Sequence, residues 1–214
     1  MSGSNYNRSS YMRYGKVNGS KWTNRNLYDP WDLEVVSAEI IFGKRIEVSK
    51  SLCVYQMQTH PKFISPLRRL DVEVAIGKLP SEFKDKLEAI ILLGGTNKQI
   101  VGANRRLRYG CYIWDRRVYI HAFPKRCLIS KYRNWPKPSV LNEYKKAGAL
   151  LREERNGLSI VFDKYSLRRF YEREVLMHEI GHHFDRLNFG RKTNKKIEGF
   201  ADWFAAEYGY RLND

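Results

Sequence analysis

The chain has 214 residues, a length that suits one domain, or a compact domain with a tail, and that is sufficient to bury a sizeable core. It carries 39 Lys and Arg against 23 Asp and Glu, which gives a formal net charge of +16 and an isoelectric point near 9.8. This charge makes an acidic partner such as nucleic acid plausible, and a solvated basic surface is the alternative interpretation.

The cysteines and the hydropathy of the sequence argue against a disulfide-rich protein, a thiolate zinc site and a membrane-spanning protein. Cys53, Cys111 and Cys127 are odd in number and widely spaced, which argues against a disulfide framework and against a thiolate zinc site. No apolar run approaches the roughly 18 residues of a membrane span, and the first residues lack the pattern of a secretory signal. The sequence therefore predicts a cytoplasmic protein without membrane contact.

Residues 1–28 are dominated by Ser, Asn, Gly, Tyr, Arg and Lys and contain almost no aliphatic side chains. Such a composition cannot bury enough apolar surface to order the backbone, so we expect a flexible basic arm. Its Tyr and Arg residues suit stacking on bases and contacts to phosphates, and a plain disordered tail is the alternative. Residues 29–214 are then expected to form a single domain.

Within that domain, apolar periodicity and turn residues predict both helices and strands. Two aromatic and β-branched runs flank Asp115, Arg116 and Arg117, the pattern of a hairpin. Two long helices near the C-terminus are expected to carry the chemistry. In chain order, the predicted elements are a strand at 71–76, a helix at 82–93, a hairpin at 110–114 and 118–122, a helix at 139–155, a strand at 157–162, and helices at 166–186, with Ser166 as N-cap, and 196–208.

The decisive motif is His178-Glu179-Ile180-Gly181-His182, an H-E-x-x-H sequence inside a predicted helix. Residues four apart lie one turn apart on the same face, so both imidazoles can reach one ion at about 2.0–2.1 Å from each nitrogen, as zinc requires. Glu179 flanks that face, where it can take a proton from a metal-bound water. We therefore predict that His178 and His182 bind Zn²⁺ and that Glu179 is the catalytic base.

A catalytic zinc site usually has three protein ligands, so a third must come from elsewhere. The last predicted helix places Glu198 and Asp202 one turn apart on a face that otherwise carries small residues. We assign Glu198 to the metal and Asp202 to orienting one of the ligating imidazoles, although pairing with a lysine or arginine is the alternative for Asp202. His183 points away from the metal face, and His60 and His121 stay unassigned.

These paired motifs resemble the zincin peptidases whose third ligand is glutamate, and among them the anthrax lethal-factor and Pro-Pro endopeptidase group. HEIGHHFD at 178–185 resembles that group's H-E-x-x-H followed by an aspartate, here Asp185. EGFADWFA at 198–205 resembles its E-x-F-A-E-x-F-A, with Asp202 in place of the second glutamate. The resemblance covers roughly the last 60 residues well and the stretch from 79 to 122 loosely.

The resemblance implies an α+β zincin fold with a small mixed sheet, in which the strand at 157–162 is the edge that pairs with an extended peptide. It also implies a tyrosine that stabilises the oxyanion and lies shortly before the third ligand. No tyrosine occurs between His183 and Glu198. Arg191, Tyr208 and Tyr210 are the alternatives, and the sequence does not choose among them.

A second resemblance is to the cytoplasmic ImmA/IrrE peptidases, which carry an E-x-x-A-N-x-F-A-like final helix. Ala201, Asp202 and Ala205 fit that pattern, with Asp for Asn. Our first functional hypothesis is therefore a zinc endopeptidase that hydrolyses a protein or peptide substrate. The second is a basic nucleic-acid-binding or host-interaction protein whose zincin unit is structural or degenerate.

Overall fold

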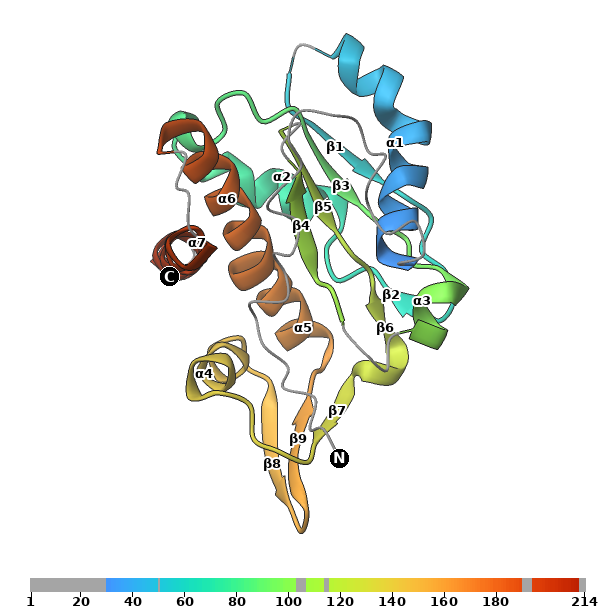
Figure 1. Ribbon diagram of the computed structural model, residues 1–214, viewed down its shortest axis with the longest axis vertical. Coiled ribbons are helices and arrows are strands. Elements are labelled where there is room, and N and C mark those ends of the chain that lie inside the picture. Colours follow the sequence, from blue (N-terminus) through green and yellow to red (C-terminus); the bar gives the residue numbers. More distant parts are fainter. Residues whose placement is uncertain (1–29, 50, 103–106, 114–115, 190–193, 212–214) are drawn as a thin grey trace.

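The computed structural model describes residues 30–49, 51–102, 107–113, 116–189 and 194–211. The expected basic arm at 1–28 lies outside these residues. The described part is a mixed α+β structure, elongated in Figure 1, with a main sheet flanked by helices and a smaller sheet at one end. None of the helices in the described ranges is long and apolar enough to cross a membrane.

The main sheet has four strands in the order β1-β3-β5-β4 and confirms the expectation of a small mixed sheet. Strands β1, β3 and β5 are parallel, and β4 pairs antiparallel with β5 as the hairpin that the sequence predicts. The pairing places β4 at the edge of the sheet. The strands are β1 (Cys53–Gln56), β3 (Ala89–Leu92), β4 (Gly110–Ile113) and β5 (Arg117–Ile120).

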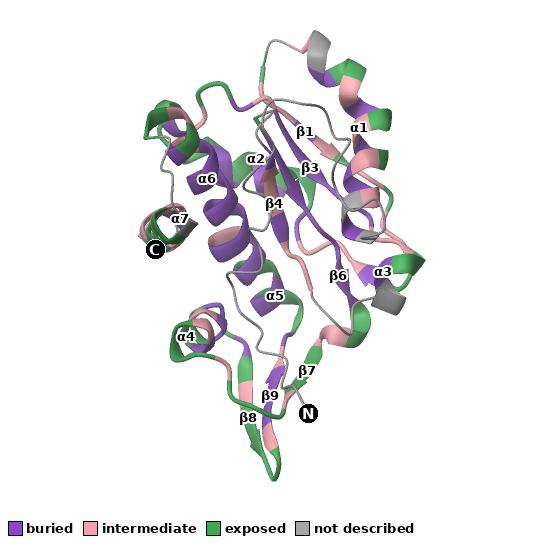
Figure 2. Ribbon diagram, viewed as in Figure 1, coloured by how far each residue is buried: buried purple, intermediate pink, exposed green. Residues whose placement is uncertain are grey.

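Helices cover both faces of this sheet. Helix α1 (Pro30–Val48) packs through Val35 and Phe42 on the face that carries Ile91. The other face, which carries Ile90, packs against α2 (Arg69–Gly77) and the helices that bear the H-E-x-x-H motif. Figure 2 shows the resulting burial of the central strands and of α6. Short elements complete this half of the chain: β2 (Phe63–Ile64) pairs with β6 (Phe123–Pro124), and α3 (Asn97–Gly102) follows β3.

The smaller sheet has the order β7-β9-β8 and is antiparallel throughout. Its strands are β7 (Ile129–Tyr132), β8 (Leu150–Glu154) and β9 (Gly157–Val161), and α4 (Pro138–Lys146) lies between β7 and β8 in the chain. Strand β9 confirms the expected strand, but the expectation that it forms a sheet edge is wrong. It is the central strand because β7 and β8 occupy both of its sides.

Helix α5 (Lys164–Phe170) follows β9 and continues through a π-helical segment (Tyr171–Leu176) into α6 (Met177–Asn188). Its N-cap is Asp163, whose side chain accepts a hydrogen bond from the Ser166 backbone amide at 2.7 Å, while the Ser166 hydroxyl accepts one from the Asp163 amide. The expected N-cap at Ser166 is therefore wrong, because Ser166 is the reciprocal partner three residues inside the helix. The final helix is α7 (Asn194–Arg211).

Two other expected elements are wrong in type. The predicted strand at 71–76 is helix α2, in which Val72, Ala75 and Ile76 are buried at helical spacing. The predicted helix at 82–93 is a 3₁₀ turn (Ser81–Phe83) followed by β3. Every residue of β3 is buried because helices pack on both faces of the sheet, so its apolar run does not alternate.

The predicted helix at 139–155 is correct only in its first half. Helix α4 ends at Lys146, and the chain turns at Gly148, whose φ of +88° favours glycine, before β8 begins. Residues 150–154 pair with β9 as a strand instead of extending the helix.

Candidate metal centre

Helix α6 places the two histidines of the motif side by side in a buried position. His178 and His182 are each 6% exposed, and their Nε2 atoms lie 2.9 Å apart. Burial in a low-dielectric site, followed by the proximity of His178, lowers the pKa of His182 well below its ordinary value. This imidazole is therefore kept neutral, the form in which histidine binds a metal ion.

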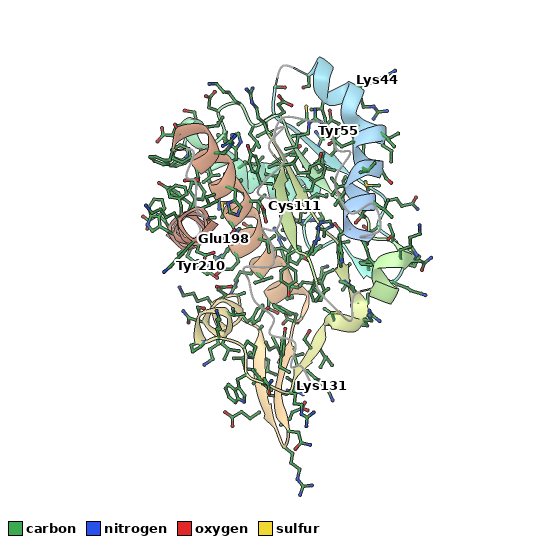
Figure 3. The ribbon with its side chains drawn as sticks, viewed as in Figure 1. Lys44, Tyr55, Cys111, Lys131, Glu198 and Tyr210 are labelled. Atoms are coloured by element: carbon green, nitrogen blue, oxygen red, sulfur yellow. The ribbon has the colours of Figure 1, made fainter. Side chains whose placement is uncertain are left out.

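Helix α7 brings the predicted third ligand to the same point. Glu198 Oε2 lies 3.6 Å from His178 Nε2, and Glu198 Oε1 lies 3.7 Å from His182 Nε2. Figure 3 shows Glu198 on α7, beside α6. Ligand atoms of these three residues all lie within 4.8 Å of one another, and within the described ranges no other group of His, Cys, Asp and Glu side chains meets this criterion.

The close approach of the two helices depends on small residues at their contact. A Cβ atom placed on Gly181 would lie 2.9 Å from Phe204 Cβ and 3.0 Å from Ala201 Cα. Ala201, Phe204 and Ala205 are fully buried. The glycine of the H-E-x-x-H motif therefore lets α7 pack directly on α6, and this packing positions Glu198 opposite the histidines.

The donor set fits a tetrahedral zinc ion. With ligand bonds of about 2.0–2.1 Å, two ligand atoms at the tetrahedral angle are about 3.4 Å apart. The separations of 2.9 Å between the two imidazole nitrogens and of 3.6 and 3.7 Å from these nitrogens to the two Glu198 oxygens bracket that value. Glu198 Oε1 is also buried without a hydrogen-bond partner among the described residues, a costly state that a cation would relieve. Two imidazoles and a carboxylate match the ligand types that zinc prefers.

Asp202 lies one turn beyond Glu198 and faces the first histidine. Its Oδ1 atom is 3.0 Å from His178 Nδ1, on the side of the ring opposite the converging Nε2 atoms. The two atoms lie at ion-pair distance but are not aligned as a hydrogen bond. A carboxylate that accepts the Nδ1 proton would leave the Nε2 lone pair available for a metal ion. The structure thus brings together His178, His182, Glu198 and Asp202, the four residues that the sequence selected for binding and orienting the metal.

Glu179 on α6 contacts the edge strand β4. It is buried, and a Cβ atom placed on Gly110 of β4 would lie 3.0 Å from Glu179 Cγ and 3.1 Å from Glu179 Oε1. The absence of a side chain at Gly110 leaves the space that the glutamate occupies. Sequence reasoning missed Gly110, although a glycine that opens a strand often marks a close approach by another group.

The remaining histidines lie outside this cluster. His183 is fully buried and its Nε2–H donates to the backbone carbonyl of Asp85 at 2.7 Å, so it is a core histidine. His121 pairs with Glu34 on α1 at 3.4 Å, and His60 Nδ1 accepts from the Lys62 amide at 3.2 Å. None of these three rings belongs to the group of converging ligand atoms.

Two of the candidate oxyanion-stabilising residues are engaged elsewhere. The Tyr210 hydroxyl donates to Glu174 at 2.6 Å, and the Tyr208 ring packs against Phe83 and Phe204 in an aromatic cluster. Arg191 lies outside the described residues. Asp185, which completes the resemblance at 178–185, is buried in α6.

Comparison of the chain with protein-family models, curated proteins and solved structures gives no match.

Proposed function

We propose that this protein is a zinc-dependent endopeptidase. The observation that carries the proposal is the convergence of His178, His182 and Glu198 from two helices, with Glu179 next to His178 in the motif. Three protein ligands would leave one tetrahedral position for water. A structural zinc site would instead fill all four positions with protein ligands. The three-ligand arrangement supports hydrolysis, the chemistry that the resemblance to zincin peptidases implies.

A bound zinc ion supplies Lewis acidity, which polarises a carbonyl oxygen and lowers the pKa of a coordinated water. The chain's own residues then handle the protons and the geometry. Glu179 accepts a proton from the attacking water and passes it to the leaving amine. Asp202, whose Oδ1 atom lies 3.0 Å from His178 Nδ1, orients that ring by its charge, and the buried surroundings keep His182 neutral.

An extended peptide has a natural docking position along β4. This strand lies at the edge of the main sheet, and its first residue, Gly110, abuts Glu179. A peptide that adds to this edge as a further strand would pass its backbone carbonyls close to the metal centre. The docking edge that the sequence assigned to 157–162 is therefore reassigned to β4, since β9 is flanked on both sides.

The proposal is tested by substituting the base without disturbing the ligands. We expect Glu179→Gln to lower the cleavage rate of a mixed-sequence peptide library by about 10²–10⁴-fold, the usual contribution of a general base, while one zinc ion per chain is retained. Mass spectrometry of the digest and elemental analysis of the same samples give both readouts. Equal cleavage by wild type and by zinc-loaded Glu179→Gln would refute the proposal.

A further inference from the structure

Half of the net charge of the chain is concentrated in one part of the fold. We define the basic wing as residues 125–173, which comprise the sheet β7-β9-β8, helices α4 and α5, and the start of the π-helical segment. These residues contain thirteen Lys and Arg against five Asp and Glu, a net charge of +8 out of +16. Residues 174–214, which carry the metal ligands, contain six Lys and Arg against seven Asp and Glu. The positive charge is therefore segregated from the candidate metal centre.

Most of the cations in the basic wing are available to a partner. Arg168 is held by Asp71 at 2.9 Å, and Lys131 lies 3.9 Å from Glu154. Eight others are exposed, and no ion-pair partner lies within 4.0 Å of them in the described ranges. These eight are Lys125, Arg133, Lys137, Lys145, Arg152, Arg155, Lys164 and Arg169. So many unneutralised cations repel one another, and an anionic partner would relieve that repulsion.

Aromatic side chains are exposed among these cations. Trp135 is 54% exposed and lies in the chain between Arg133 and Lys137, and Tyr165 is 79% exposed beside Lys164. Planar faces interleaved with cations are the surface on which unpaired bases stack.

The outer face of the small sheet adds an apolar row next to the charges. Ile129, Val161 and Leu150 are register partners across the three strands, and both Ile129 and Leu150 are at least half exposed. In the next row on the same face, Lys131 and Arg152 flank Ser159. The apolar row and the cationic row therefore lie side by side, about 7 Å apart along each strand, so that one can contact a base and the other its phosphate.

We propose that the basic wing binds single-stranded nucleic acid, with phosphates on the exposed Lys and Arg side chains and bases on Trp135 and Tyr165. This binding is separate from the metal centre. His178 lies fourteen residues beyond Lys164 in the continuous helix, about 20 Å along its axis. The exposed rings favour a single strand over a duplex, whose bases are already stacked.

The test uses the full-length chain and a fluorescein-labelled 20-nucleotide oligo(dT), with fluorescence anisotropy measured over a range of salt. The wing variant Arg133→Gln, Arg152→Gln, Arg155→Gln removes three exposed cations. The control variant Lys44→Gln, Lys62→Gln, Lys98→Gln removes three exposed lysines outside the wing that likewise lack a described ion-pair partner. Figure 3 shows Lys44 and Lys131 towards opposite ends of the molecule.

We expect log Kd of the wild type to rise linearly with log salt. In the wing variant the slope should fall by about 2, since each phosphate contact on a single strand contributes about 0.7. The control variant, with the same net charge as the wing variant, should keep the wild-type slope. Equal slopes for both variants, with far-ultraviolet circular dichroism confirming that both are folded, would overturn the proposal. Binding would then depend on the net charge of the chain and not on the cations of the basic wing.

A second series tests the bases. Trp135→Ala should weaken oligo(dT) binding by about five-fold or more, and Trp135→Phe should retain most of the affinity because a ring still stacks. A duplex of the same length should bind more weakly than the single strand. Unchanged affinity in Trp135→Ala, or tighter binding of poly-glutamate than of oligo(dT), would overturn the assignment to nucleic acid. Glu179→Gln should bind oligo(dT) as the wild type does, so this result and the outcome of the peptidase test are independent.

Discussion

Substitution of Gly181 tests whether the close contact between α6 and α7 depends on the absence of a side chain at this position. In Gly181→Ala the new methyl group would lie 2.9 Å from Phe204 Cβ and 3.0 Å from Ala201 Cα, both of which are fully buried. Overpacking of this kind destabilises by about 1–3 kcal/mol. The matched control is Gly199→Ala in α7, where nothing lies within 4 Å of the new Cβ. Alanine is favoured over glycine in a helix by up to about 1 kcal/mol, so the control should be neutral or stabilising.

Calorimetry with and without zinc separates the two effects of Gly181→Ala. Each kcal/mol lost should lower the midpoint of thermal unfolding by about 2–4 °C in a chain of this size. Because the methyl group pushes Glu198 away from the histidines, the increase in the unfolding midpoint on adding zinc should also be smaller than in Gly199→Ala. Equal midpoints and equal zinc-dependent increases in the two variants would refute the inference that direct helix packing positions the third ligand.

Three further predictions follow from other contacts. Gly110→Ala should lower peptide cleavage at unchanged zinc content, because its methyl group would occupy the space of the Glu179 side chain, and unchanged cleavage would contradict this geometry. Asp202→Asn should weaken zinc affinity by about 10–100-fold, measured by competition with a chelator, and unaltered affinity would exclude an orienting role. Burial alone would raise the pKa of Asp71, but hydrogen bonds from Arg68 outweigh burial and lower that pKa. The ionised Asp71 therefore stabilises the folded state fully above the ordinary carboxyl pKa. This stabilisation disappears as pH falls through the pKa of Asp71 in the folded state. Between about pH 5 and pH 3 the wild type should therefore lose more free energy of unfolding than Asp71→Asn, and parallel losses in urea titrations would contradict this.

The candidate site was accessible to sequence reasoning because its geometry is local to two helices. Spacing of four residues fixes His178 and His182 on one face, and the same spacing fixes Glu198 and Asp202 on another. Once both helices exist, the apolar core that they share leaves few ways to pack them. The structure accordingly brings the four side chains within 2.9–3.7 Å of their neighbours in the cluster.

The sheet was harder to predict because its strands depend on distant partners. The run at 89–93 has an apolar spacing compatible with a helix, and only packing against α1 on one face and α2 on the other selects the strand. Val72 and Val74 favoured a strand at 71–76, yet burial of Val72, Ala75 and Ile76 on one helical face outweighs that local preference.

The order of strands within the sheets also could not be predicted from local sequence patterns. Which strand lies at an edge is decided by pairings between segments far apart in the chain, such as β1 with β3 and β7 with β9. Glu179 therefore meets Gly110, more than sixty residues earlier in the chain, and no local pattern links the two.

The central claim, that two helices hold one zinc ion through two imidazoles and a carboxylate, is tested most directly by X-ray absorption at the zinc edge. We expect one zinc ion per chain, with two imidazole nitrogens and a carboxylate oxygen at about 2.0–2.2 Å. This signal should disappear in His182→Ala and persist in Glu179→Gln. Equal zinc content in the wild type and in His182→Ala, or a first shell without imidazole, would contradict the account.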